Sequence, residues 1–396
     1  MPTPELDLIL KGGHVIDPSS ATNGLLDIGI VEGKIAAIAP NLEAGRNSID
    51  VSGKYVCPGL IDLHGHWYEG SSFGIDPNIC LNHGVTTVVD AGTTGFLNFP
   101  YFRRHTIDPA DVSVLAFIHV GCNGLPTTVV GELEDLRYAR PVETAVIINA
   151  NRDVAVGVKL RIGTMTRGHA LEALDLAVDA SNQANTGLMI HISSEAPTRE
   201  VLKRLRPGDI LTHCFQGRGD GLFKENRELL PEAIEARKRG VVFDVGHGCG
   251  SFSWDVARRA FEYHFWPDTI STDLHRFCVE RWSKDLPTTM SKFLHLGMSL
   301  EDVISKTTWA PAQALGRSDL GSLRMGSIAD ILVFSVDEGE FEFEDTHLRI
   351  EKARKKVTPR LVFRQGKPIA PGSYPTRLRP LLPCDREVLD FVEQTK

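Results

Sequence analysis

Two histidines, His64 and His66, stand two residues apart at the end of an apolar run that covers residues 56–63. An apolar run of this length predicts a buried strand, and residues i and i+2 of a strand point to the same side. Both imidazoles can therefore bind one metal ion. An isolated His-x-His pair would be explained more simply as the solvated end of a strand, so the assignment depends on the rest of the chain.

Further strand-like runs end in residues that can also take part in metal binding. They end in Lys159, His191, His213 and Asp273. Imidazole and carboxylate groups are typical ligands of zinc, iron and manganese. A lysine ammonium would repel a cation. A buried, neutral lysine amine can instead react with carbon dioxide to give a carbamate, and the two carbamate oxygens can bridge two metal ions.

Each of these residues has a simpler explanation when it is taken alone. Lys159 could form an ordinary ion pair, and His191 or His213 could be a hydrogen-bonded core histidine. Asp273 could cap the N-terminus of a helix. The joint pattern favours a metal site, because all of these side chains would otherwise have to fall at strand ends by chance.

The elements that must position these residues are eight apolar runs with helix-like segments between several of them. The runs cover residues 56–63, 86–90, 112–120, 154–160, 187–192, 209–213, 240–245 and 269–273, and the clearest helical patterns cover 169–180 and 225–239. This alternation fits an α/β fold, a (β/α)8 TIM barrel, which is typically about 250 residues long and has its active site at the carboxyl ends of the strands. A doubly wound open sheet is the alternative, but it favours a glycine-rich turn after the first strand.

Both ends of the chain read as short strands with tight turns, including the hairpin turn Glu32-Gly33. Neither end is long enough to hold a good core alone. We therefore expect a small β-sandwich domain made of residues 1–55 and 318–375. It would lie beside a barrel of residues 56–317 and be followed by a proline-rich tail, 376–396.

The bulk composition excludes several classes of protein. The 396 residues carry a formal net charge of −8, and the one basic block, residues 351–356, reads as a solvated face or a strand edge. We therefore expect no nucleic-acid partner, and no apolar run is long enough to cross a membrane. The seven cysteines lack Cys-x-x-Cys pairing, and the N-terminus lacks a signal-peptide pattern. These features predict a cytoplasmic protein with free thiols, and a homo-oligomer is expected.

The chain resembles the amidohydrolase superfamily. The matching segments are residues 58–66, 157–159, 191, 212–213, 271–273 and 321–331. The resemblance covers nearly the whole chain and implies a hydrolase with two divalent metal ions, with zinc expected and manganese or iron as alternatives. It also implies that His64, His66 and Asp273 hold one metal and that His191 and His213 hold the second. Carboxylated Lys159 would bridge both.

In the mechanism that follows, a hydroxide bridging the metals attacks the acyl carbon, and Asp273 carries its proton to the leaving group. The resemblance implies that the substrate is a small acylated compound whose amide or ester bond is cleaved, as in a deacetylase, and it favours an N- or O-acetyl group on a small carboxylate. Candidate substrate contacts near the strand ends are His275, Arg161, Asn123 and His247.

Departures from the sequence patterns of related groups reduce the number of possible substrate classes. Dihydroorotases usually have an arginine just after His-x-His, where this chain has Trp67-Tyr68. Deaminases of the superfamily typically lack the bridging lysine and have a catalytic glutamate near the fifth-strand histidine. Glu195 lies four residues after His191, but Lys159 argues against that group. A dihydroorotase- or hydantoinase-like cyclic amidase, a mononuclear deaminase and a non-catalytic scaffold stay open as alternatives.

Overall fold

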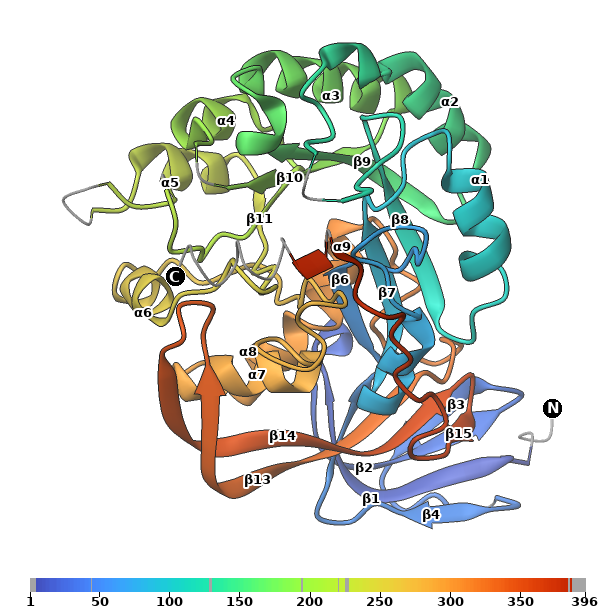
Figure 1. The fold of residues 1–396 in the computed structure, drawn as a ribbon. Helices are drawn as coiled ribbons and strands as arrows, with labels where there is room; N and C mark the ends of the chain where they lie inside the picture. The colour runs from blue at the N-terminus through green and yellow to red at the C-terminus, as the bar shows by residue number, and fades with distance from the viewer. Residues whose placement is uncertain are drawn as a thin grey trace.

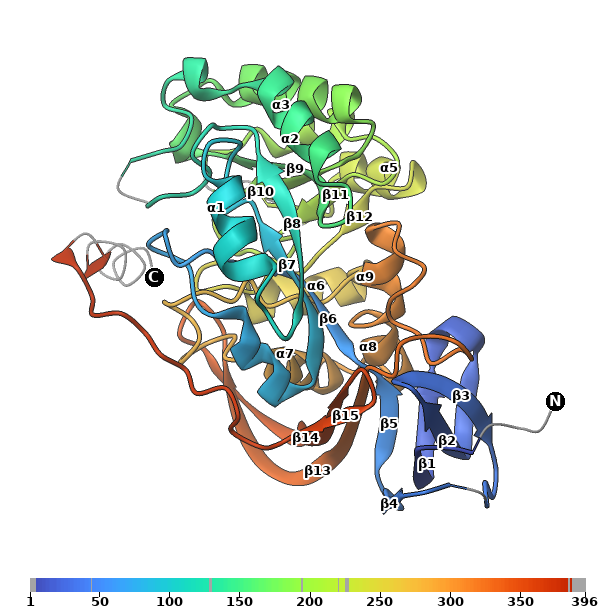
Figure 2. The same ribbon diagram turned by 90° about the vertical axis from the view of Figure 1, so that its right-hand side faces the viewer.

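Two sheets organise the chain in the computed structural model, which describes residues 5–43, 45–127, 130–193, 195–219, 221–224, 228–383 and 385–386 (Figure 1). The first is a curled sheet of seven parallel strands with helices outside it. The second is a mixed sheet built from both ends of the chain, which lies beside the barrel in both views (Figure 2). This arrangement confirms the predicted TIM barrel with an additional β domain.

The barrel strands follow one another around the sheet in chain order. They are β6 (Leu60–Gly65), β7 (Val85–Ala91), β8 (Ser113–His119), β9 (Ala155–Ile162), β10 (Gly187–Ile192), β11 (Ile210–Thr212) and β12 (Val242–Phe243). All residues of β6 and β7 are buried, as expected for parallel strands that are covered on both faces. Their carboxyl ends therefore share one rim.

The prediction of a regular eighth strand over residues 269–273 was wrong. This segment joins its neighbours on both sides through isolated bridges. The backbone N–H of Thr272 donates to Asp62 Oδ1 at 3.0 Å instead of to a strand carbonyl, and Asp273 has a left-handed φ of 48°. A side-chain acceptor and a left-handed residue both interrupt a ladder, although the barrel still closes at this point.

The apolar run 56–63 also differs from its prediction, because it contains parts of two strands. β5 (Tyr55–Pro58) pairs with β13 (Ile331–Glu344) in the second sheet, and β6 begins at Leu60 in the barrel. Gly59 lies at the crossing, where an added Cβ would be 2.2 Å from Thr86 Oγ1. Both sheets are buried here, so a continuous apolar pattern hides the change of sheet.

Helices cover the outside of the barrel sheet (Figure 1). They are α1 (Phe99–Phe102), α2 (Pro141–Ala150), α3 (Ala170–Ala184), α4 (Thr198–Arg204), α5 (Pro231–Lys238), α6 (Trp254–Glu262), α7 (Leu286–His295), α8 (Leu300–Ser305) and α9 (Trp309–Ala314). The helix predicted over 169–180 is confirmed as α3. The one predicted over 225–239 is shorter, because Pro231 starts it, and residues 225–227 lie outside the described residues.

The second sheet has the strand order β15-β14-β13-β5-β1-β2-β3, with β4 beside β1. Its remaining members are β1 (Leu8–Asp17), β2 (Thr22–Val31), β3 (Lys34–Ala39), β4 (Ser48–Asp50), β14 (Ile350–Arg364) and β15 (Lys367–Ile369). Glu32 and Gly33 form the predicted turn between β2 and β3, with φ values of 47° and 73°. Two left-handed residues match the right-handed twist of the flanking strands.

The described cysteines are free thiols, and Cys384 lies outside the described residues. Of the predicted tail, residues 384 and 387–396 also lie outside them. Among the helices that are described, none combines the length and the apolar composition needed to span a membrane.

Candidate metal centre

The carboxyl ends of the barrel strands bring the predicted ligands into one buried cluster. His64 lies near the end of β6 and His66 directly follows the strand, and their Nε2 atoms lie 3.3 and 3.2 Å from Asp273 Oδ1. Lys159, on β9, places its Nζ 3.5 Å from His64 Nε2. Two imidazoles, a carboxylate and a lysine amine therefore meet on this side of the rim.

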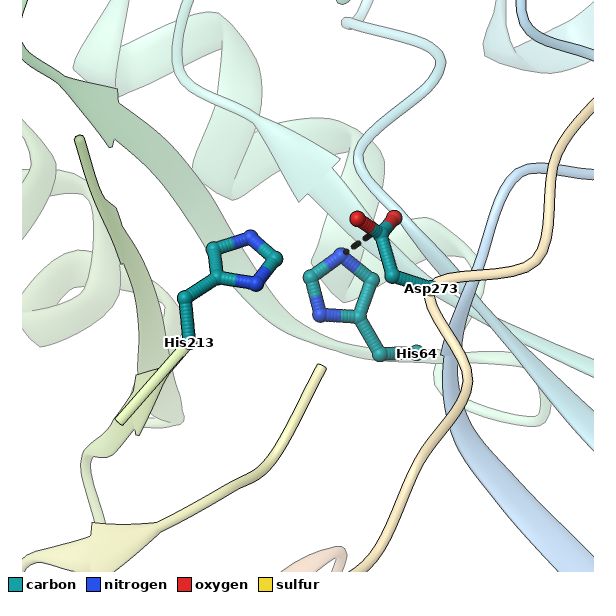
Figure 3. Close-up of side chains that lie close together, drawn as sticks. All are labelled: His64, His213 and Asp273. Carbon is teal, nitrogen blue, oxygen red and sulfur yellow. Dashed lines mark ion pairs between the residues drawn. The ribbon is translucent and has the colours of Figure 1, made fainter. Parts of the chain in front are cut away.

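His191 and His213 form the other side of the cluster. Their Nδ1 and Nε2 atoms, respectively, are 2.7 Å apart, and the ring centroids of His64 and His213 are 5.0 Å apart. Figure 3 shows the His213 ring beside the His64 ring, with the Asp273 carboxylate close to His64. Ligand atoms of these three residues all lie within 4.8 Å of one another, which makes them a possible metal site.

Hydrogen bonds fix which nitrogen His64 and His213 direct into the cluster. His64 Nδ1 lies 2.9 Å from Thr212 Oγ1, and that hydroxyl donates to Asp244 Oδ2 at 2.7 Å. Because the single threonine proton goes to Asp244, the Thr212 oxygen accepts from His64 Nδ1–H. The lone pair of His64 Nε2 is left for the cluster, which is how a second interaction selects the tautomer of a metal-binding histidine.

Two further rings have partners for Nδ1. His66 Nδ1 lies 2.8 Å from Thr93 Oγ1, and the backbone N–H of Thr93 donates to Asp90 Oδ1 at 2.7 Å. His213 Nδ1 lies 2.6 Å from the carbonyl oxygen of Gly246, which can only accept a hydrogen bond. Its Nε2 lone pair therefore also faces the cluster.

The environment keeps the imidazoles neutral. Burial is the largest cause that lowers the pKa of His64, His66 and His191 well below the ordinary histidine value, and neighbouring positive charges add to the effect. Burial likewise lowers the pKa of His213 to about 4. A neutral imidazole is the form that binds a metal ion.

Two of the clustered residues have strained backbones. His213 and Asp273 have φ values of 65° and 48°, which non-glycine residues rarely adopt. Each follows a residue whose hydroxyl is bonded to a buried aspartate, Thr212 to Asp244 and Thr272 to Asp62. Such strain costs about 1–3 kcal/mol per residue and is held by its surroundings, as is typical of functional sites.

Asp273 Oδ1 provides a direct test of whether a cation fits. The atom is buried and has no hydrogen-bond partner among the described residues. It lies 3.3 Å from His64 Nε2, which is an acceptor in the tautomer that Thr212 selects, and 3.2 Å from His66 Nε2. A buried carboxylate oxygen without a donor is costly. A divalent cation satisfies the oxygen and both nitrogens together, so the residues present fit a metal.

Glycines leave room for two of these side chains. A Cβ added at Gly92 would lie 2.5 Å from Cβ and Cγ of Lys159, and one added at Gly248 would lie 2.4 Å from Asp273 Oδ2. Both glycines also have positive φ values. The close approach of backbone to side chain therefore requires glycine at these positions.

We expect Gly92→Ala to displace Lys159 and to reduce both bound metal and activity. Gly168→Ala is the matched control, because Gly168 also has a positive φ but nothing lies within 4 Å of its added Cβ. The control should lose only about 1–2 kcal/mol of unfolding free energy. Denaturant unfolding and metal analysis distinguish the two effects, and equal metal content in both variants would contradict this assignment.

Of the four candidate substrate contacts, His275 and Arg161 lie beside the cluster. The His275 ring centroid is 6.1 Å from that of His66, and the backbone N–H of Phe277 donates to His275 Nδ1 at 3.1 Å. Arg161 follows Lys159 by two residues on β9 and donates from Nη1 to Glu132 Oε1 at 2.7 Å. Both side chains of this ion pair are largely buried, so it is not an ordinary surface ion pair.

The other two candidates do not face the cluster. Asn123 is exposed, and the Nε2 atom of His247 lies 2.6 Å from the Lys292 ammonium nitrogen. His247 also stacks on Phe252, with centroids 4.7 Å apart. Glu195, considered as a deaminase glutamate, is exposed as well.

His119 and Glu132 were missed by the sequence interpretation. His119 ends β8 and pairs in register with Lys159, and its buried Nε2 has no hydrogen-bond partner among the described residues. The strand-end rule that found the other histidines could have found it. Glu132 lies in the loop after β8, and no spacing rule connects it to Arg161.

Comparison with known proteins agrees with this geometry. The model of the Amidohydrolase family matches residues 255–369. The chain is 33% identical over 377 residues to a deacetylase of Brucella anthropi, covering 93% of this chain and 92% of the relative. A solved adenine deaminase has a TM-score of 0.86 and 30% identity, covering 92% of this chain and all of that one. A solved dihydroorotase has a TM-score of 0.85 and 31% identity, covering 92% and 97%.

The names of these relatives differ in substrate, and each describes that protein alone. What they share with this chain is a fold over nearly its full length and a place in one enzyme family. They favour a hydrolase over the scaffold alternative. The similarity over nearly the whole chain and the shared fold show that the chain belongs to the amidohydrolase family and is a hydrolase.

Proposed function

We propose that this hydrolase uses two divalent metal ions, with zinc as the first candidate, to cleave an amide or ester bond of a small acylated substrate. The ions would be held by His64, His66 and Asp273 on one side and by His191 and His213 on the other, with a carbamate on Lys159 between them. The observation that carries the proposal is the buried Asp273 Oδ1, which has two imidazole nitrogens within 3.3 Å and no hydrogen-bond partner among the described residues.

Bound metal ions would lower the pKa of a water molecule and stabilise negative charge on the substrate carbonyl oxygen. The water oxygen adds to the acyl carbon, and the bond to the leaving nitrogen or oxygen breaks. Asp273 accepts the proton of the attacking water and returns it to the leaving atom. The left-handed backbone and Gly248 fix the direction of its carboxylate.

His275 is the proposed substrate contact on the same side. Its Nδ1 accepts from Phe277, so its proton is on Nε2 when the ring is neutral. Burial lowers the pKa of His275 to about 4, which keeps the ring neutral near pH 7. A neutral N–H donor beside the cluster can bind a substrate oxygen without adding positive charge next to the metals.

Similarity to the deacetylase favours an acyl substrate over a purine. Similarity to the dihydroorotase keeps a cyclic amide as the second candidate. Against it, the residues after the histidine pair are Trp67 and Tyr68, and neither side chain offers a positive charge to a substrate carboxylate.

The test is metal analysis combined with a substrate screen. Protein loaded with zinc or manganese should bind two equivalents and release acetate from N-acetyl amino acids or O-acetyl hydroxy acids. Removal of metal by a chelator should abolish turnover, and metal should restore it. Hydrolysis of cyclic amides or ureides alone would select the cyclic amidase instead. One metal with deamination of adenine would select the deaminase, and protein without metal or activity would refute the proposal.

A further inference from the structure

The chain after β15 leaves the second sheet and returns to the barrel. Figure 1 and Figure 2 both show this C-terminal segment, in red, running from β15 toward the barrel. Near its start, the Tyr374 hydroxyl donates to Asp111 Oδ2 at 2.7 Å, just before β8 begins. Farther along, the segment contacts Arg276, which lies three residues after the proposed proton carrier Asp273. It therefore reaches a loop of the metal centre.

Arg276 is held there by two residues of the C-terminal segment, Arg379 and Asp385. Arg276 Nη2 donates to the carbonyl oxygen of Arg379 at 2.7 Å, and its Nη1 lies 3.6 Å from Asp385 Oδ2. The Arg379 guanidinium donates to both oxygens of the same carboxylate, at 2.6 and 3.0 Å. The backbone N–H of Leu382 donates to Asp385 Oδ2 at 2.7 Å. Asp385 is therefore the shared acceptor of this network.

Burial makes the Arg276–Asp385 contact sensitive to substitution. The two side chains are 3% and 0% exposed, and Arg276 Nε is buried without a hydrogen-bond partner among the described residues. Burial raises the pKa of Asp385, but hydrogen bonds from Arg379 and Leu382 and the two positive charges outweigh it and hold the pKa below its usual range. Removing one charge of a buried pair leaves the other uncompensated. The position of the Arg276 side chain therefore depends on the C-terminal segment.

The loop that contains Arg276 also orients His275. The backbone N–H of Arg276 donates to the carbonyl oxygen of Phe73 at 3.0 Å. The Phe73 ring packs against His275 and His66, with centroid distances of 5.2 and 5.7 Å. On the other side of Arg276, the backbone N–H of Phe277 donates to His275 Nδ1. Because both supports of the His275 ring are linked to Arg276, a shift of Arg276 changes the direction of the His275 Nε2–H group.

We propose that Asp385 is a positioning residue that acts through Arg276 and holds the loop 273–277 in the conformation that presents His275 to the substrate. The C-terminal segment then supports substrate binding without touching the substrate. This inference rests on the proposed function in one respect, which is the assignment of His275 as a substrate contact. It does not depend on whether the substrate is an acylated compound or a cyclic amide.

The first test is the kinetics of Asp385→Asn with the substrate that the screen identifies. The amide keeps the shape of the carboxylate but leaves the two arginine charges uncompensated. We expect KM to rise by about tenfold and kcat to stay within about threefold of the wild type. The two constants separate because His275 is displaced, whereas Asp273 is still held through the bond of Thr272 to Asp62. A merely structural role of Asp385 would lower the unfolding free energy and leave KM unchanged.

A double-mutant cycle shows whether Asp385 acts through Arg276. Arg276→Met should raise KM to a similar extent, and adding Asp385→Asn to it should raise KM by less than about twofold further. Effects that multiply fully would show that Asp385 acts by another route and would overturn the inference.

Tyr374→Phe is the matched control for these variants. It removes a hydrogen bond of the same segment at the amino end of β8, opposite the rim, and should keep the wild-type KM. Asp385→Glu keeps the charge and should recover part of the lost affinity. Arg379 is 35% exposed, so Arg379→Met weakens the hold on Asp385 with less risk to folding. It should raise KM as well and is the second variant if Asp385→Asn does not fold.

Hydrogen exchange of the metal-loaded full chain measures the loop without any substrate. The amides of residues 274–278 should exchange about tenfold faster in Asp385→Asn and at the wild-type rate in Tyr374→Phe. Unchanged exchange in Asp385→Asn, or an unchanged KM, overturns the inference and leaves the hydrolase proposal intact. If the metal-loaded wild type hydrolyses neither an acylated compound nor a cyclic amide, the proposed function fails, and the exchange rates alone decide whether Asp385 holds the loop.

Discussion

Replacement of Asp273 by asparagine is expected to lower kcat by about 10²- to 10⁴-fold while the fold and much of the metal content are retained. The amide has nearly the same shape as the carboxylate and can still place an oxygen between His64 and His66. It cannot accept the proton of the attacking water, however, so the proton transfer that the proposal assigns to Asp273 is lost. Steady-state kinetics measures kcat, metal analysis measures the bound metal, and circular dichroism shows whether the fold is retained.

Asp319→Asn is the control for this substitution. Asp319 forms an ion pair with Arg317 at 2.7 Å, and its side chain is 58% exposed. An exposed pair of this kind contributes little, so activity should stay close to that of the wild type. Turnover by Asp273→Asn within about tenfold of the wild type, with metal bound, would rule out Asp273 as the proton carrier.

The placement of the cluster was predictable because strand ends follow a simple rule. Side chains at alternate positions share a face, and the carboxyl ends of parallel strands share a rim. Histidines and a lysine at the ends of apolar runs must then converge, as His64, Lys159 and His191 do. The prediction needed only approximate strand ends, so it survived the errors at residues 56–63 and 269–273.

The rule fails where the backbone leaves the strand. His247 was expected to face the rim, but it lies between glycines with φ values of 49° and 54°. Its ring turns instead toward the buried amine of Lys292. A buried ammonium requires acceptors, and this long-range demand cannot be read from the spacing of residues around position 247.

Residues that act through others are the hardest to predict. Thr93, Asp244 and Glu132 each hold a side chain of the cluster or its rim, yet they come from loops or from ordinary buried positions. Threonine, aspartate and glutamate also occur at many positions that have only a structural role. What distinguishes them is a three-dimensional contact, and a single sequence contains no signal for it.

Replacement of Lys159 by methionine is expected to have the largest effect, with loss of at least one metal ion and of nearly all activity. Lys159 is fully buried, and no carboxylate within the described residues lies at ion-pair distance from its Nζ. Burial lowers its pKa to about 7, so a large fraction of the amine is neutral near that pH. A neutral buried amine beside His64 is poised to take up carbon dioxide, and methionine keeps the length of the side chain without the amine.

The measurement is metal content and activity after apoprotein is reloaded in buffer free of carbon dioxide or supplemented with bicarbonate. Bicarbonate should increase metal content and activity in the wild type and should change neither quantity in Lys159→Met.

Lys292→Met is the matched control, because Lys292 is equally buried and burial also lowers its pKa to about 7. Its Nζ already lies 2.6 Å from His247 Nε2 and donates to the carbonyl oxygens of Trp282 and Glu344. No carbamate can form there without breaking these contacts, so Lys292→Met should be less stable but still respond to bicarbonate. Two tightly bound metals in Lys159→Met would show that the cations do not depend on a bridge at this position.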